Sequence, residues 1–168
     1  YKIENEHWWF AARKQIVWEF IRKRLNTPAG SRLLDVGCGT GAILDMLSQR
    51  FDVYGQDVSE QAVAFCRRRG LRNVYCGPIS QVVPADKPFD LVTTLDVIEH
   101  IDDDIGTLRQ IHGLLRVGGS VLIAVPAFPS LSGPHDVVTH HKRRYVKSTL
   151  RSSVEQAGFE VEYMTYFN

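Results

Sequence analysis

The chain has 168 residues, of which 44% are hydrophobic and 23% are charged, and these values predict one soluble globular domain with a substantial core. The formal net charge of +1 argues against a nucleic acid or an acidic membrane surface as partner, and no apolar run approaches the roughly 20 residues that span a bilayer. Three cysteines without C-x-x-C spacing predict reduced thiols and a cytoplasmic location. The chain starts at Tyr1 without a signal-peptide layout, which predicts a fragment boundary at that end.

Residues 1–30 form the first predicted element, a helical segment. Trp8, Trp9 and Ile21 belong to a set of apolar side chains that recur at helical spacing. The sequence T-P-A-G at residues 27–30 would end the helix. Two interpretations remain open: a helix packed on a sheet, or a lid over a bound ligand.

A strand, a glycine-rich turn and a helix are predicted next. The strand Arg32–Val36 contains Asp35, and Gly37, Gly39 and Gly41 follow at every second position. Glycine accepts positive φ and lets a ligand lie against the backbone. The start of the following helix offers unpaired N–H groups to polar atoms. This G-x-G-x-G spacing differs from the G-x-G-x-x-G spacing of the dinucleotide fingerprint.

The next predicted strand covers residues 52–56 and is followed by Asp57. In Rossmann-type units a ribose-binding carboxylate lies about 20 residues after the glycine-rich turn, as Asp57 does here. Further strands are predicted at residues 73–76, 89–95, 120–125 and 159–166, with helices between them. The predicted fold class is therefore α/β, a Rossmann-like doubly wound, mostly parallel sheet of about six strands that binds ligands at the carboxyl ends of its strands.

Four stretches in order resemble the motifs of class I S-adenosylmethionine-dependent methyltransferases. They are D-V-G-C-G-T-G at 35–41, V-Y-G-Q-D-V-S at 53–59, F-D-L-V-T-T-L-D-V-I-E-H at 89–100 and L-L-R-V-G-G at 114–119. The resemblance covers most of residues 33–126. It implies an enzyme with S-adenosylmethionine as cofactor and S-adenosylhomocysteine as product.

The resemblance also implies which residues hold the cofactor. On the motif positions it implies contacts from Asp35, Gly37, Cys38, Gly39, Gly41, Asp57, Val58, Ile79 and Leu95. One position departs from the family pattern, because Pro78 stands where an acidic residue usually contacts the adenine amino group. Adenine recognition would then rest on backbone groups, on Ser80 or on Ile79.

Two further stretches resemble a bacterial, small-molecule subgroup of that family. They are the aromatic opening E-H-W-W-F at 6–10 and the stretch H-K-R-R-Y at 141–145, which fits an H-x-R-R-Y pattern. In that subgroup the N-terminal segment can fold over the cofactor. The resemblance therefore implies a lid at residues 1–30, with the guanidinium of Arg13 as a fork-shaped donor to the cofactor's carboxylate.

A catalytic base is predicted in the stretch 126–145, whose lack of periodicity is typical of functional or disordered loops. Histidine is the residue there that can accept a proton at neutral pH. We predict that His141 is the base, with His135, paired with Asp136 as its orienting carboxylate, as the rival.

The acceptor is predicted to contact Glu99, Arg144 and Tyr145. In the alternative interpretation, Arg143 or Arg144 pairs with Glu99 or Asp136 and only fixes the loop. The histidines and the aspartate between residues 135 and 141 match no known ligand spacing, so the sequence predicts no metal site.

The expected architecture is one methyltransferase domain at 1–168, with a lid at 1–30, a cofactor-binding core at 31–125 and a substrate-side loop, helix and last strand at 126–168. The expected reaction is methyl transfer to an oxygen of a small-molecule or lipid-precursor acceptor, since L-D-V-I after the fourth strand differs from the N/D-P-P-Y/F of enzymes acting on adenine or glutamine. A non-catalytic S-adenosylmethionine-binding module and a nicotinamide-dependent oxidoreductase are the alternatives. The family's sheet has seven strands and six are expected here, which predicts an open gap beside strand five or a homodimer that fills it.

Overall fold

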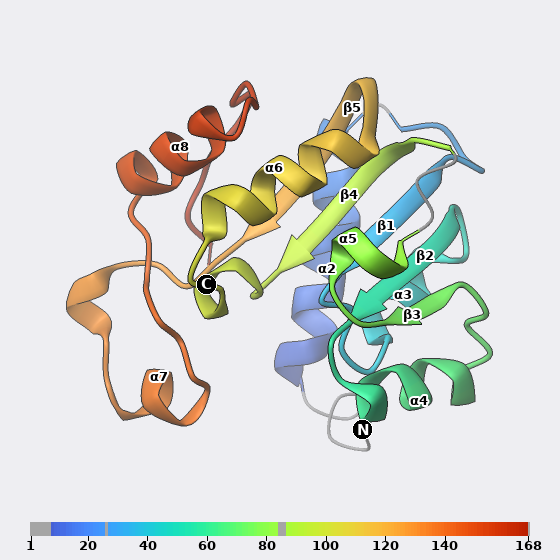
Figure 1. The fold of residues 1–168 in the computed structure, drawn as a ribbon, viewed down its shortest axis with the longest axis horizontal. Coiled ribbons are helices and arrows are strands. Elements are labelled where there is room, and N and C mark those ends of the chain that lie inside the picture. Colours follow the sequence, from blue (N-terminus) through green and yellow to red (C-terminus); the bar gives the residue numbers. More distant parts are fainter. Residues whose placement is uncertain (1–7, 26, 84–86, 168) are drawn as a thin grey trace.

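Five parallel strands form the central sheet of the computed structural model, which describes residues 8–25, 27–83 and 87–167 (Figure 1). The strand order is β3-β2-β1-β4-β5. The strands are β1 (Arg32–Val36), β2 (Asp52–Asp57), β3 (Val74–Cys76), β4 (Phe89–Leu95) and β5 (Leu115–Ala124). The predicted doubly wound parallel sheet is confirmed, and the strand order reverses between β1 and β4, where such sheets bind their ligands.

The helices alternate with the strands. They are α2 (Trp8–Arg24), α3 (Ala42–Leu47), α4 (Glu60–Arg68), α5 (Ile79–Val82), α6 (Asp104–Leu114), α7 (Pro134–Val138) and α8 (Lys147–Gln156), with short 3-10 helices η1 (Ile98–His100) and η2 (Pro129–Leu131). None of the helices in the described part of the chain combines the length and the apolar character that a bilayer span requires.

Strand β1 shows why the sheet is covered on both faces. Successive side chains of a strand point to opposite faces, and Leu33 and Leu34 are both fully buried. Leu33 packs in a cluster with residues of α2, α3 and α4, whereas Leu34 packs in a second cluster with residues of α5 and α6. A strand that is apolar on both faces is typical of a parallel sheet between two helical layers.

Helix α2 confirms the predicted N-terminal helix over the described residues. Val17 and Ile21 are buried against the sheet layer, while Trp8 at the start of the helix is 71% exposed. The helix therefore packs on the core through its second half. Of the opening E-H-W-W-F at 6–10, residues 6 and 7 lie outside the described part of the chain.

The segment after β5 forms a separate lobe beside α6. Helix α8 packs on α6 through Val154 and Ala157, which share a third apolar cluster with Leu108. The stretch between β5 and α8 runs out to α7 and back (Figure 1). Its base is closed by a parallel bridge between Ala127 and Tyr145, so the predicted irregular loop is ordered at its two ends.

Strand β5 differs from the prediction at its start. It begins at Leu115, which pairs with Phe89, but the next pair is Leu91 with Ser120. The residues between Leu115 and Ser120 therefore interrupt the register inside one strand, so the strand begins before the predicted start at residue 120.

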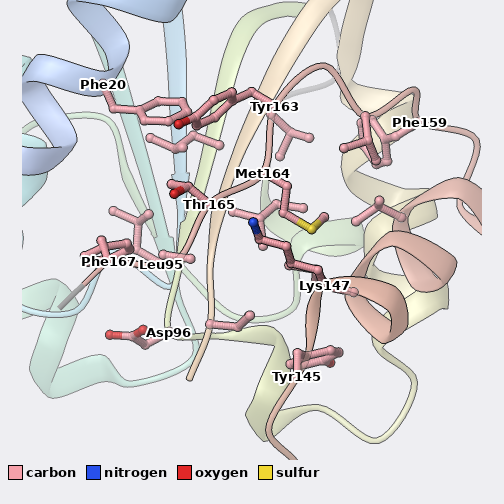
Figure 2. A pocket seen from close by; sticks show the side chains of 18 of the residues that line it. Phe20, Leu95, Asp96, Tyr145, Lys147, Phe159, Tyr163, Met164, Thr165 and Phe167 are labelled. Carbon is pink, nitrogen blue, oxygen red and sulfur yellow. The ribbon is translucent and has the colours of Figure 1, made fainter. Parts of the chain in front are cut away.

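The predicted sixth strand at residues 159–166 does not form. These residues have no strand pairing in the described structure, because the free edge of β5 lies across a cavity of about 1760 Å³ that both segments line. Figure 2 shows Tyr163, Met164 and Thr165 of this segment around the cavity. The sheet thus has five strands and a gap beside β5, and the homodimer that would fill the gap remains a prediction.

Candidate active site

The glycine-rich turn lies directly after β1, at the carboxyl ends of the strands. Gly37 and Gly39 have φ of 68° and 53°, in the left-handed region. A Cβ on Gly37 would collide with Cγ2 of Val97, while the space above Gly39 is open. The turn therefore needs glycine for its conformation at both positions and leaves one backbone face accessible to a ligand.

Asp57 holds this turn from the neighbouring strand. The backbone N–H of Gly39 donates to its Oδ2 at 2.9 Å, and that of Ser59 donates to its Oδ1 at 2.8 Å. A carboxylate has about four lone-pair positions, so both oxygens can also accept hydroxyl hydrogens. The acid predicted for ribose binding is thus aimed at the turn at the end of β2.

Asp35 is a buried carboxyl beneath the turn, with 3% of its surface exposed. Burial raises the pKa of Asp35 to about 7, against the opposing effects of the hydrogen bond from Thr93 and the charge of Arg13. The hydroxyl of Thr93 donates to Oδ1 at 2.6 Å. A cationic group placed next to Asp35 would favour its ionised form.

Helix α2 and the end of β4 place an ion pair at the same edge. Arg13 on α2 pairs with the carboxylate of Asp96. Asp96 has φ of 56°, an uncommon conformation for a residue other than glycine. The guanidinium that was predicted to meet the cofactor's carboxylate is therefore paired with Asp96 beside the glycine-rich turn.

Two cavities meet at this ion pair. A smaller cavity of about 180 Å³ lies over the glycine-rich turn, and the larger one runs along β5. Both are lined by Arg13, Leu95 and Asp96, and Figure 2 shows the latter two at one end of the larger cavity. A ligand over the turn and a ligand in the larger cavity would therefore meet at the carboxyl end of β4.

The predicted cofactor residues divide between this smaller cavity and its surroundings. Those that line it are Arg13, Asp35, Gly37, Cys38, Gly39 and Leu95. Gly41 begins α3 with φ of 80°, and Asp57 supports the turn. The side chain of Val58 is 76% exposed, and that of Ile79 is buried in the core.

The acceptor side, which is the region predicted to contact the methyl acceptor, is built around His141. Its Nδ1 lies 2.8 Å from Oδ1 of Asp136, and the hydrogen bond from Arg144 keeps the pKa of Asp136 well below its usual range. An ionised carboxylate can only accept, so Nδ1 of His141 donates to it. His141 is largely buried and lines the larger cavity.

Asp136 was predicted as the orienting carboxylate of His135, and the structure pairs it with His141. His135 belongs to α7, but its side chain lies outside what the structure describes. The residue that sequence reasoning underrated is His100, which lies in η1 with its ring 4.8 Å from that of His141. The E-H pair after the fourth strand was a visible signal for it.

The basic run at 142–144 is engaged by carboxylates. Lys142 pairs with Asp102, and Nη1 of Arg143 lies 2.9 Å from Asp104. Nε of Arg144 lies 2.8 Å from Oδ1 of Asp136, as in the alternative in which this arginine fixes the loop.

The other two predicted substrate residues are fully or nearly buried. Tyr145 is 4% exposed and its hydroxyl donates to Asp104 at 2.8 Å, so its oxygen is held within the lobe. Glu99 in η1 has no exposed surface, and burial raises its pKa to about 7. Its carboxylate faces His141, with Oε1 4.0 Å from Nε2.

A parallel sheet of this order, with a glycine-rich turn after β1 and a carboxylate at the end of β2, defines a Rossmann-like protein that binds a nucleoside cofactor. The comparison with known families is more specific. The family described as "Methyltransferase domain" matches residues 7–163. The chain belongs to the class I S-adenosylmethionine-dependent methyltransferases, as its motifs predicted.

Individual relatives agree with this assignment. A probable S-adenosylmethionine-dependent methyltransferase of Mycolicibacterium smegmatis is 30% identical, over 95% of this chain and 62% of that protein. A ubiquinone biosynthesis O-methyltransferase of Pseudomonas aeruginosa is 31% identical, over 80% and 66%. The structure of S-adenosylmethionine-bound CalS10, an amino pentose methyltransferase from Micromonospora echinaspora, is 27% identical with a TM-score of 0.61, over 71% and 52%. The chain thus spans just under two thirds of the first two relatives.

Proposed function

We propose that this protein transfers the methyl group of S-adenosylmethionine to a hydroxyl oxygen of a small-molecule or lipid-precursor acceptor. The observation that carries this proposal is the junction of the two cavities. The cavity over the glycine-rich turn and the cavity that contains His141 share Arg13, Leu95 and Asp96. Methyl transfer needs a donor site next to an acceptor site, and the shared lining of the two cavities supports that arrangement.

The cofactor-side residues fit S-adenosylmethionine. The buried carboxyl of Asp35 suits an amino group, Arg13 suits a carboxylate, and Asp57 suits a pair of ribose hydroxyls. When bound, the cofactor supplies a methyl group on a positively charged sulfur. The chain's main task is then to align the acceptor oxygen behind that methyl group and exclude water, which contributes roughly 7–11 kcal/mol.

His141 is the proposed base for a hydroxyl acceptor. As the acceptor oxygen bonds to the methyl carbon and the carbon–sulfur bond breaks, the hydroxyl proton passes to Nε2 of His141. Asp136 holds the ring in the required tautomer and would stabilise the imidazolium that forms. A positioned base of this kind contributes about 10²- to 10⁴-fold.

The larger cavity supports an acceptor with an apolar part. Phe20 and Tyr163 face one another across its far end with ring centroids 5.7 Å apart, and Leu150 and Val161 also line it. The P. aeruginosa relative, by its name, methylates an oxygen in ubiquinone biosynthesis. An acceptor with a hydroxylated ring and an apolar tail therefore fits best.

The lid is also a proposal. Helix α2 contributes Phe10, Arg13 and Lys14 to the smaller cavity, which places the helix over the turn. At about 180 Å³ this cavity is smaller than the 300–1,000 Å³ usual for ligand sites. Helix α2 would therefore move outward to admit the cofactor and return to cover it.

Thermal unfolding tests the proposed cofactor. S-adenosylmethionine or S-adenosylhomocysteine at a hundredfold excess over Kd should stabilise the folded protein by about 2.7 kcal/mol. NAD should leave the melting temperature unchanged, and a shift with NAD alone would favour the oxidoreductase instead. Screening hydroxylated acceptors for S-adenosylhomocysteine release then separates an enzyme from a non-catalytic binding module.

The pH dependence of cofactor binding tests Asp35. Because its pKa is about 7, the carboxyl is mostly protonated at pH 6, and a cationic amino group should displace that proton. Between pH 6 and 7 the ionised fraction rises about fivefold, so Kd should fall by about fivefold. This window lies below the usual α-amino pKa of about 7.7–8.0. Calorimetry should show a flat profile for Asp35→Asn, and a flat profile in the wild type would exclude the contact.

A further inference from the structure

Helix α8 turns one stripe of side chains toward the larger cavity. Lys147, Leu150 and Val154 line that cavity, at positions i, i+3 and i+7 of the helix, which places them on one face. Leu150 and Val154 also pack in the apolar cluster that α8 shares with α6. A charged side chain on an otherwise apolar stripe is the feature of this face that packing does not explain.

The arginines that line this cavity in the described structure all have partners. Most of them pair with carboxylates, and one lies over an aromatic ring. The pairs are Arg13 with Asp96, Arg116 with Asp90, Arg144 with Asp136 and Arg24 with the ring of Tyr163. An anion that enters the cavity would therefore have to displace a partner before it could bind one of these guanidinium groups.

Lys147 differs from these arginines, because no carboxylate among the residues that the structure describes pairs with it. Its Nζ lies 5.0 Å from the centroid of the Tyr166 ring, which is a weak contact at an exposed site. The ammonium group has three N–H donors, and none of them meets an acceptor in the described part of the chain. Figure 2 shows the side chain of Lys147 extending from α8 into the cavity. Its charge is therefore available to a ligand.

An aromatic pair orders the surroundings of Lys147. The backbone N–H of Lys147 donates to the hydroxyl oxygen of Tyr166 at 3.1 Å, and the Tyr166 ring stacks on that of Phe128 with centroids 4.7 Å apart. The backbone N–H of Phe128 donates in turn to the carbonyl of Tyr145 at 2.9 Å. These contacts hold an aromatic wall beside the ammonium group, so a ligand that binds there has fewer protein groups to immobilise.

We propose that Lys147 binds an anionic group of the methyl acceptor, a carboxylate or a phosphate, and so selects acidic acceptors over neutral ones. This inference rests on the proposed function and narrows its substrate class to hydroxylated acceptors that carry an acidic group beside their apolar part. A lysine offers a compact point charge that suits either anion. His141 and Lys147 both line the larger cavity and lie on one continuous segment, which would recognise the hydroxyl and the anion together.

The test compares 3,4-dihydroxybenzoate with its methyl ester, which has the same hydroxylated ring but no charge. Both are titrated by calorimetry into protein saturated with S-adenosylhomocysteine. The wild type should bind the acid about fivefold or more tightly than the ester, and added salt should reduce this preference. Lys147→Met should bind both probes alike, whereas Lys147→Arg should keep the preference. Phenyl phosphate is titrated in the same way, and the anion whose affinity falls further in Lys147→Met is the one that the site prefers.

Lys142→Met is the matched control for this test. It removes the same charge earlier in the same segment, from a side chain that pairs with Asp102 and does not line the cavity, so the preference for the acid should stay as in the wild type. Equal binding of acid and ester by the wild type would overturn the proposal, as would an undiminished preference in Lys147→Met. Melting curves show whether each variant is folded. These titrations need no turnover, and a lack of stabilisation by S-adenosylhomocysteine would count against the proposed function instead.

Discussion

Replacing His141 by alanine should lower kcat by about 10²-fold or more and leave the affinity for S-adenosylmethionine unchanged. The reason is that His141 is the proposed base for the acceptor hydroxyl, and Asp136 orients its ring through Nδ1 at 2.8 Å. The proposed cofactor site is the cavity over the glycine-rich turn, which His141 does not line. The measurement is steady-state methyl transfer to a hydroxylated acceptor, together with cofactor calorimetry.

Asp136→Asn separates a positioning role from a structural one. Asparagine keeps the size of the side chain but lacks the charge that favours the imidazolium, so kcat should fall while the melting temperature changes little. If His141 only anchors the loop, its loss should instead raise KM and lower the melting temperature together.

His135 remains the rival for this role. Full turnover by His141→Ala together with an inactive His135→Ala would assign the base to His135. His140→Asn is the control for these turnover measurements, because it removes a neighbouring exposed histidine and should turn over normally. If His141→Ala and His135→Ala both turn over at the wild-type rate, the reaction uses no histidine in this loop.

The sheet and the cofactor side were predictable because local rules determine them. The bounds of β1 and β4 agree with the sequence prediction, since each is a short apolar run ended by an acidic or glycine-rich stretch. The turn at Gly37 and Gly39 was predictable because its left-handed backbone requires glycine. Asp57 follows from the geometry of two adjacent parallel strands.

The acceptor side was only partly predictable, because long-range pairing determines it. Spacing pointed to Asp136 beside its neighbour His135 and could not show that the loop also brings Asp136 to His141. The charges of the basic run at 142–144 are paired with carboxylates such as Asp102 and Asp104. No periodicity encodes these contacts, since they depend on how the loop folds back onto η1.

The predicted sixth strand shows a third limit of prediction from the sequence. Residues 159–166 alternate as a strand would, but alternation predicts a strand only when an edge is available to pair with. Here the segment packs through Phe159 and Val161 on the cluster beside α6, and a cavity separates it from β5. The alternating pattern alone could not show whether the segment would pair with β5 or pack on the cluster beside α6.

The second large effect is expected at Asp57. Asp57→Ala should weaken S-adenosylmethionine binding by about 1.5–3 kcal/mol, the usual contribution of a charge-assisted hydrogen bond, which corresponds to about 10- to 150-fold in Kd. The same carboxylate accepts the N–H groups of Gly39 and Ser59. Part of the loss should therefore come from a loosened glycine-rich turn and not from the ribose contact alone.

Asp57→Asn separates these two contributions. Its side-chain oxygen can still accept one backbone N–H, but it lacks the charge that strengthens hydrogen bonds from ribose hydroxyls. Calorimetry should give a Kd for Asp57→Asn between those of the wild type and Asp57→Ala. Both variants should unfold cooperatively, because the buried apolar clusters on the two faces of the sheet do not include this residue. Wild-type affinity in Asp57→Ala would move the ribose site away from the end of β2, and with it the assignment of the cavity over the glycine-rich turn.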